Sequence, residues 1–229
     1  IDSCNGWNPT DIFVRTYEKS KEFTKSYGFR MKTDSENKLT RNTGFYERTS
    51  KLTRNFVDAR GFWLPNDYTK HGVINEYNAC REDAVLIDLS SLRKFEILGP
   101  DAEELMNYTL TRNVKKLSVG QIVYSAMCYQ NGNMFDDGTL LKLSDHGFRW
   151  VCGDEYGGEW LKEQAKKKNY KVHIKNSTDQ INNLSLQGPK SRKILEKIIF
   201  TPPTQPSISE LEWFRFTVCR VEELQGIPL

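Results

Sequence analysis

The 229-residue sequence has few of the residues from which common metal and redox sites are built. Its three histidines, His71, His146 and His173, are too scattered to predict a metal cluster. Its five cysteines include no C-x-x-C pair, which argues against both a zinc site and a disulfide framework. Few, widely separated cysteines are typical of a reducing compartment, so we expect a cytoplasmic protein.

The sequence also lacks long hydrophobic runs and the short motifs of several enzyme classes. No apolar stretch approaches the ~20 residues of a membrane-spanning helix, so we expect no membrane insertion. No G-x-G-x-x-G, P-loop or G-x-S-x-G occurs, so dinucleotide, P-loop and serine-hydrolase sites are not predicted. The 33 basic and 30 acidic residues nearly balance without any recognition motif, so we expect no nucleic-acid binding.

Composition divides the chain near residue 45. Residues 1–44 are rich in Lys, Thr, Ser, Asn and Arg and carry only a weak apolar pattern, which predicts a polar N-terminal extension. From residue 45 onward, alternating strands and amphipathic helices are expected, so residues 45–229 are predicted to form one domain. The hydrophobic fraction of 38% is sufficient for a packed core.

A partial internal repeat indicates the fold class. The segments FEILGPDAEELM (95–106) and LSLQGPKSRKIL (184–195) align without gaps, and each predicts a strand, a Gly-Pro break and a helix. Glycine permits the tight exit from the strand, and proline suits the first helical position because its missing N–H would be unpaired there. Two such units separated by antiparallel hairpins predict an α+β fold with internal pseudo-symmetry.

Two adjacent aspartates lie in the middle of one predicted hairpin strand. The dipeptide Asn131-Gly132 is a strong hairpin signal, and a two-residue turn there sets Ala126 opposite Asp137. Side chains alternate along a strand, so Asp136 is expected to point to the opposite side from Asp137. One face is then predicted to carry Tyr124, Ala126, Cys128, Phe135, Asp137 and Thr139.

A carboxylate on such an aromatic wall is costly unless it has a partner. In a structural role, Asp137 would accept backbone hydrogen bonds or pair with a buried Arg81 or Arg149. In a functional role, its fixed negative charge would meet a cationic ligand, with aromatic neighbours to hold a flat ring. The residues alone leave both roles open. For Asp136, simple solvation at a strand edge would suffice.

Three ordered blocks of sequence carry a family resemblance. They are NACREDAVLIDLSSLRKFEILGPDAEELM, TRNVKKLSVGQIVYSAMCYQNGNMFDDGTLLKL and NNLSLQGPKSRKIL. In this order the chain from residue 45 to residue 229 resembles the glycine cleavage T-protein (aminomethyltransferase) and folate-dependent demethylase family. The resemblance implies a tetrahydrofolate-binding α+β domain that is incomplete at the C-terminus of this chain.

The resemblance also implies site residues. By the family pattern Asp137 is the catalytic carboxylate, Tyr124 lines the folate pocket, Trp150 packs on the folate, and Asp136 is structural. The family's glycine-cleavage members have Ser-His-Met where this chain has Ser90-Ser91-Leu92. That difference favours a demethylase-like relative with another donor.

The implied protein is therefore an enzyme. It would be a tetrahydrofolate-dependent methyl or aminomethyl transferase that acts on a small methylated amine or onium compound. One alternative is the folate-binding module of a flavin-dependent amine dehydrogenase. Others are a non-catalytic folate-binding scaffold of the iron–sulfur assembly type and a fold with an inactive pocket. The expected partners are a small-molecule methyl donor and, as a candidate, a flavoprotein or carrier protein.

Overall fold

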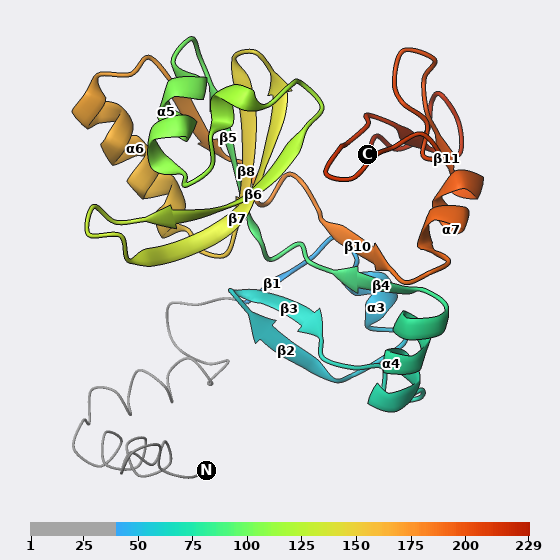
Figure 1. Cartoon of the computed structure of the whole chain (residues 1–229). Helices are drawn as coiled ribbons and strands as arrows, with labels where there is room; N and C mark the ends of the chain where they lie inside the picture. Colours follow the sequence, from blue (N-terminus) through green and yellow to red (C-terminus); the bar gives the residue numbers. More distant parts are fainter. Residues whose placement is uncertain (1–39) are drawn as a thin grey trace, which may run out of the picture.

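The centre of the molecule is an antiparallel sheet of five strands in the order β6-β7-β8-β5-β9. The computed structural model describes residues 40–229 (Figure 1). The strands are β5 (Arg93–Leu98), β6 (Ile122–Cys128), β7 (Met134–Ser144), β8 (Gly147–Cys152) and β9 (His173–Asn176). Both predicted hairpins are formed and share β7 as their middle strand. The predicted mixed α+β class is thus confirmed.

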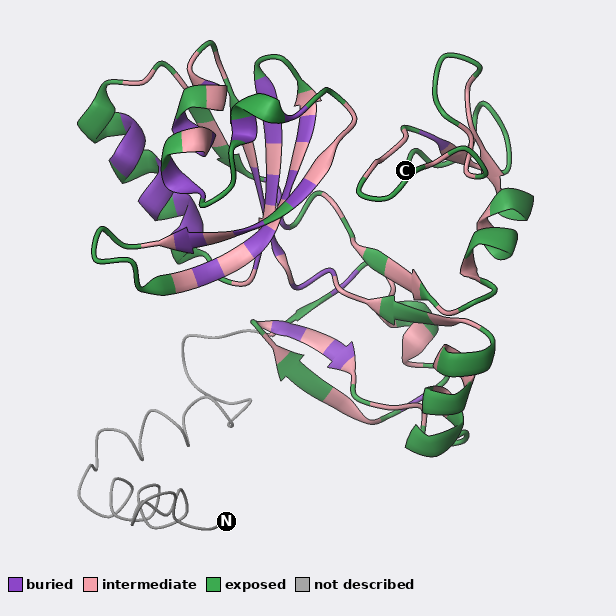
Figure 2. Cartoon of the chain, viewed as in Figure 1, coloured by how far each residue is buried: buried purple, intermediate pink, exposed green. Residues whose placement is uncertain are grey.

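Two helices cover one face of this sheet and bury its core. They are α5 (Ala102–Thr109) and α6 (Tyr156–Lys168), with the short 3₁₀ helix η1 (Val114–Lys116) beside α5. Every second residue of the strands points toward them, as the pleat of a strand requires. In Figure 2 the buried residues gather in this sheet and on the inner sides of the two helices. Among residues 40–229, no helix covers the other face of the sheet (Figure 1).

Smaller elements flank the central sheet. A three-stranded sheet contains β1 (Arg41–Asn42), β2 (Phe56–Ala59) and β3 (Phe62–Pro65), and two-stranded ladders join β4 (Val85–Asp88) to β10 (Leu184–Gln187) and β11 (Ile199–Phe200) to β12 (Arg220–Val221). The remaining helices are α3 (Tyr46–Thr49), α4 (Val73–Glu82) and α7 (Ser191–Ile198). Neither α4 nor α7 contains a fully buried residue. Among residues 40–229, the helices are all too short or too polar to cross a membrane.

The predicted polar extension mainly concerns residues 1–39, which lie outside the described residues. Its last residues are folded, because Arg41–Asn42 pair with β3 as the parallel strand β1. The buried Thr43 hydroxyl donates to Asp88 of β4 at 2.6 Å. The folded region therefore reaches back at least to residue 41.

Both predicted strand–Gly-Pro–helix units are present. Gly99 follows β5 and Gly188 follows β10, with φ angles of 137° and 126° that favour glycine. A Cβ on Gly99 would collide with the Lys171 carbonyl oxygen, and one on Gly188 with the Asp83 carbonyl oxygen. These carbonyls precede β9 and β4, which are the antiparallel partners of β5 and β10. The two units therefore share the same local packing, although their helices start two residues after the prolines.

The glycine pair Gly157-Gly158 allows α6 to pack closely on the sheet. A Cβ on Gly158 would lie 2.6 Å from Cζ and 2.8 Å from Cδ1 of the buried Phe95 ring. A Cβ on Gly157 would make only ordinary contacts, with its nearest neighbours at 3.5 Å. The second glycine is therefore required by packing, whereas the first is not.

We expect Gly158→Ala to lower the free energy of unfolding by about 2–3 kcal/mol, because the added methyl overpacks the core against Phe95. Gly157→Ala is the matched control, and its better helix propensity should raise that free energy by up to about 1 kcal/mol. Urea unfolding of both variants and the wild type measures the two effects. Equal stability of the two variants would contradict the packing argument.

Candidate functional site

The β6–β7 hairpin brings Tyr124 and Asp137 together. Tyr124 pairs with Thr139 and Ala126 pairs with Asp137, as the sequence predicts. Asp137 is therefore diagonal to Tyr124, and the Tyr124 hydroxyl donates a hydrogen bond to Asp137 Oδ2. Asp137 is half-buried, while the Tyr124 side chain is 53% exposed. The pair lies on the sheet face that α5 and α6 leave uncovered.

The tip of this hairpin differs from the prediction. The Tyr129 amide donates to the Asn133 carbonyl, so the connecting loop contains three residues and ends in Gly132 with φ at 83°. The register then shifts, and Cys128 pairs with Met134 instead of Phe135. The predicted position of Phe135 beside Asp137 is therefore wrong. Its ring packs toward α6, with its centroid 5.3 Å from that of Trp160.

Asp136 fulfils the structural role that was considered for its neighbour. Its side chain is 8% exposed, which rules out a solvated strand edge. Oδ1 accepts hydrogen bonds from the amides of Asp137 (2.9 Å) and Gly153 (3.2 Å), and Oδ2 accepts one from the amide of Asp154 (3.2 Å). This carboxylate ties β7 to the turn that precedes α6. Asp136 is thus structural, as predicted.

The environment of Asp136 also makes Cys152 chemically inert. Burial, and then the negative charge of Asp136, raise the pKa of the Cys152 thiol far above its ordinary value. The thiol stays protonated at neutral pH, and only the thiolate is a good nucleophile. We therefore do not count Cys152 among the candidate reactive groups.

Among residues 40–229, Asp137 has no arginine partner. Arg149 pairs instead with Glu96 of β5, with 2.7 Å between Nε and Oε1. Within the described residues, no salt bridge reaches Asp137. Its one side-chain hydrogen bond there comes from Tyr124. The purely structural interpretation of Asp137 therefore has little support among residues 40–229.

Trp150, the third predicted site residue, is not part of this arrangement. It is fully buried and faces the core, paired with Leu140 and Phe95. A direct contact between Trp150 and a ligand beside Asp137 is incompatible with this position, so we correct the predicted folate contact. Its neighbour Val151 faces the open side instead and pairs with Thr139.

A β-bulge determines the face on which Trp150 lies. The β7–β8 ladder shifts between Lys142 and Ser144, and without that shift Trp150 would oppose Leu141 on the face of Asp137. A one-residue change of register moves every side chain to the other face. The sequence shows the turn but gives no signal for the bulge. The residues that share the open face beside the pair include Thr139, Leu141 and Val151.

A buried cation completes this face. Lys94 pairs with Val151 across the ladder and is 2% exposed. Its ammonium donates to the carbonyl oxygens of Leu92 at 2.8 Å and Ser90 at 3.0 Å. Burial, with a smaller contribution from the neighbouring Arg93, lowers the pKa of Lys94 to about 8. Lys94 is therefore still mostly protonated at pH 7 and holds the segment that joins β4 to β5.

This surface fits a flat, partly polar ring. The Tyr124 ring offers an aromatic surface, Leu141 and Val151 offer half-buried apolar ones, and Asp137 offers acceptors for ring N–H donors. A reduced pterin has these complementary properties. By contrast, no group of three or more His, Cys, Asp or Glu among residues 40–229 could hold a metal ion.

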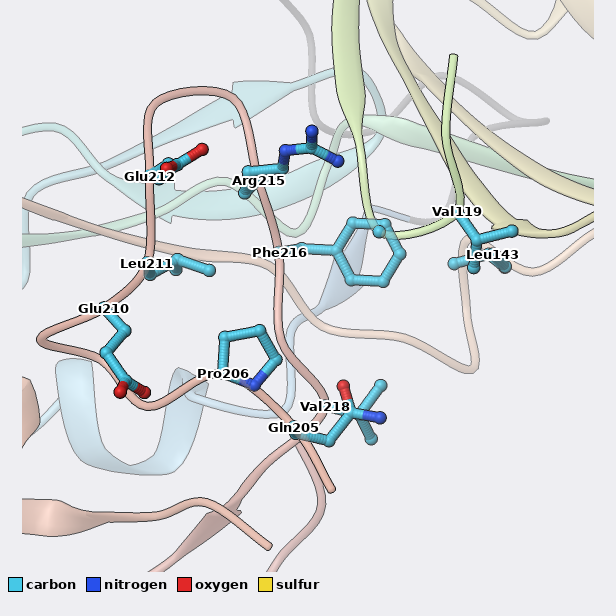
Figure 3. A pocket seen from close by; sticks show the side chains of 11 residues that line it. Val119, Leu143, Gln205, Pro206, Glu210, Leu211, Glu212, Arg215, Phe216 and Val218 are labelled. Atoms are coloured by element: carbon cyan, nitrogen blue, oxygen red, sulfur yellow. The ribbon is translucent and has the colours of Figure 1, made fainter. Parts of the chain in front are cut away.

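Cavities elsewhere do not include the pair. One of about 360 Å³ lies between the β6–β7 end of the sheet and the C-terminal segment, and Figure 3 shows Phe216 pointing toward Val119 and Leu143 there. Another of about 420 Å³ is lined by residues 50–54 and Thr69. Neither contains Tyr124 or Asp137. The candidate site therefore lies outside both of these cavities.

Comparisons with known proteins agree with this architecture. The chain is 50% identical over 227 residues to a trimethylamine-oxide aldolase of Ruegeria pomeroyi, a match that covers 99% of this chain and 29% of that protein. It is 34% identical over 161 residues to an aminomethyltransferase of Alkaliphilus metalliredigens, covering 69% of this chain and 41% of the relative. The chain thus spans less than half the length of these relatives.

A solved structure shows the same fold. The crystal structure of glycine cleavage system aminomethyltransferase T from Bartonella henselae superposes with a TM-score of 0.60 at 25% identity, covering 68% of this chain and 43% of that one. Residues 45–229 also match the family model described as the GCVT N-terminal domain. The chain belongs to the GCVT N-terminal domain family.

Proposed function

We propose that this protein binds tetrahydrofolate on the open face of its five-stranded sheet and takes part in one-carbon transfer from a small methylated amine or onium compound. The observation that carries the proposal is the hydrogen-bonded pair of Tyr124 and Asp137 on that face. The family to which the chain belongs includes aminomethyltransferases, which supports a role in one-carbon transfer. The name of the trimethylamine-oxide aldolase supports a methylated nitrogen compound as the donor.

Asp137 is the group that would stabilise the positive charge of the donor. The donor carries a positive charge at nitrogen, and a half-buried carboxylate stabilises such a charge more than bulk water does. The second oxygen, Oδ1, is free of side-chain hydrogen bonds among the described residues and can accept a proton. Reduced folate would supply the nucleophilic nitrogen that accepts the one-carbon unit.

Tyr124 would position the Asp137 carboxylate and the flat ring of the ligand. Its hydroxyl fixes Asp137 Oδ2 and so orients the carboxylate. Its exposed ring is the aromatic surface on which a flat heterocycle would stack. Val151 and Leu141 would exclude water from the second side of this surface. Together these residues position two reactants, which is a major part of the rate enhancement in a transfer reaction.

A second candidate function is a folate-binding module within a larger enzyme. The match that covers 99% of this chain but only 29% of a relative favours it. In this case another protein segment, a flavoprotein or a carrier protein would release the one-carbon unit, and the Tyr124–Asp137 surface would receive it. A purely non-catalytic scaffold is less well supported, because it has no use for a half-buried carboxylate beside the ring surface.

Calorimetric titration of tetrahydrofolate into the protein tests the proposal. We expect micromolar affinity, followed by formation of a folate-bound one-carbon product when methylated amines, betaines or sulfonium compounds are added. Product formation with the isolated protein would favour the transferase, and folate binding without turnover would favour the module. Absence of tetrahydrofolate binding at millimolar concentration would refute both.

A further inference from the structure

Three arginines, Arg41, Arg60 and Arg93, lie where the β2–β3 hairpin approaches the five-stranded sheet. Arg41 pairs with Asp179 at 2.6 Å, and Arg93 lies 3.4 Å from a carboxylate oxygen of Glu155. Arg60 has no carboxylate within 4.0 Å and no side-chain hydrogen bond among residues 40–229. Within residues 40–229, Arg60 is therefore the one of the three that has no carboxylate partner.

Arg60 also occupies an unfavourable backbone position. It is the first residue of the two-residue turn that joins β2 to β3, and its φ is 56°, followed by Gly61 at 79°. Both central residues of such a turn have positive φ, for which asparagine or glycine is the favoured choice. An arginine there costs free energy, and such costs are often retained where the side chain has a function.

The turn is fixed from three sides. The Gly61 amide donates to Asp58 Oδ1 at 2.8 Å, and the Arg93 guanidinium donates to the Arg60 carbonyl oxygen at 2.8 Å. The amide of Arg41 donates to the Gly61 carbonyl oxygen at 2.9 Å. These three hydrogen bonds fix the backbone of the turn and thus the position from which the Arg60 side chain extends.

The Arg60 side chain reaches the edge of the candidate site. Its Nη2 and Nε lie 3.7 and 4.0 Å from the position that a Cβ on Gly153 would take. That position is 3.0 Å from Asp136 Oδ1, which accepts the amides of both Gly153 and Asp137. The tip of the β2–β3 hairpin points toward this end of the five-stranded sheet (Figure 1). The Arg60 guanidinium therefore lies near Gly153, one residue beyond Cys152, which pairs with Gly138 next to Asp137 in the β7–β8 ladder.

We propose that Arg60 binds a carboxylate of the ligand whose cationic or N–H-bearing part lies at Tyr124 and Asp137. This inference rests on the proposed function. A guanidinium presents parallel N–H donors that match a carboxylate, and an exposed one without an internal partner is available for it. Asp137 and Arg60 together select a ligand with opposite charges at its two ends. The carboxylate belongs to the glutamyl tail of folate or to a carboxylated donor.

The test compares Arg60→Asn with the wild type and with Arg54→Asn, which removes an exposed positive charge elsewhere in the same small region. The probes are tetrahydrofolate and 6-methyltetrahydropterin, which lacks carboxylates, and then dimethylglycine and trimethylamine in the presence of the pterin. We expect Arg60→Asn to weaken binding of one carboxylated probe by about 10-fold or more. Affinity for the probes without carboxylates should stay within about 2-fold.

The same variant should be more stable than the wild type. Asparagine adopts positive φ more readily than arginine does, so we expect the Tm of Arg60→Asn to be about 1–3 °C higher than that of the wild type. Higher stability with weaker carboxylate binding supports the inference, and the affected probe identifies the source of the carboxylate. Unchanged binding of both carboxylated probes, or an equal loss for all four probes, overturns it. If the wild type binds no tetrahydrofolate, the proposed function fails and this inference fails with it.

Discussion

Asparagine in place of Asp137 is expected to lower the rate of one-carbon transfer by about 10²–10³-fold. The substitution keeps the shape of the side chain but removes the charge that faces the cationic donor. Loss of one pre-positioned electrostatic contact in an active site typically has an effect of this size. The measurement is single-turnover formation of the folate product from the methylated donor that gives the highest wild-type rate.

The control for this variant is a measurement of its free energy of unfolding. Because Asp137 has only one side-chain hydrogen bond among the described residues, Asp137→Asn should unfold within about 0.5 kcal/mol of the wild type. Tyr124→Phe should reduce the rate less, since it retains both the ring and the carboxylate. A wild-type rate in Asp137→Asn would show that the carboxylate does not act in the reaction.

Substitution of the neighbouring aspartate, Asp136, should mainly lower the stability of the protein. Asp136→Ala is expected to lower the free energy of unfolding by about 3 kcal/mol. The change leaves the amides of Asp137, Gly153 and Asp154 without their acceptor in a buried place. Each unpaired buried donor costs about 1–3 kcal/mol, partly relieved where water can enter. Urea unfolding at neutral pH measures the loss.

Asp137→Ala is the matched comparison, because it makes the same chemical change one residue along β7. We expect a loss below about 1 kcal/mol there. Asp136→Asn should be intermediate, since its amide oxygen still accepts some of the hydrogen bonds. If the two alanine variants were equally stable, the assignment of a structural role to Asp136 and a functional role to Asp137 would be wrong.

The sequence predicts the central part of the site for a clear physical reason. Strand alternation and the Asn131-Gly132 turn determine which residues oppose each other near the middle of the hairpin. Tyr124 and Asp137 therefore meet in the structure as predicted. The repeated Gly-Pro segments are equally informative, since Gly99 and Gly188 each permit an approach of another backbone that no larger residue allows.

The errors lie near register shifts in the ladders. Phe135 was expected on the face of Asp137, and Trp150 was expected to pack on folate. Both pack toward the core beside a register shift. A bulge depends on packing of the finished sheet, so the local sequence carries no reliable signal for it. The position of the Arg60 side chain near Gly153 was not predicted either, because the hairpin that carries Arg60 is distant from β7 and β8 in the chain.

The pairing of β4 with β10 has a consequence for the order of assembly. Leu184 pairs with Asp88, and the whole five-stranded sheet lies between these residues in the chain. In an unfolded chain, closing so long a loop is entropically costly and is repaid by only a four-residue ladder. Once β5 and β9 have paired side by side, the ends of the loop are already neighbours and most of that cost is gone. The central sheet therefore forms first and brings β4 and β10 together. Substitutions that slow formation of the sheet will also slow formation of the β4–β10 ladder.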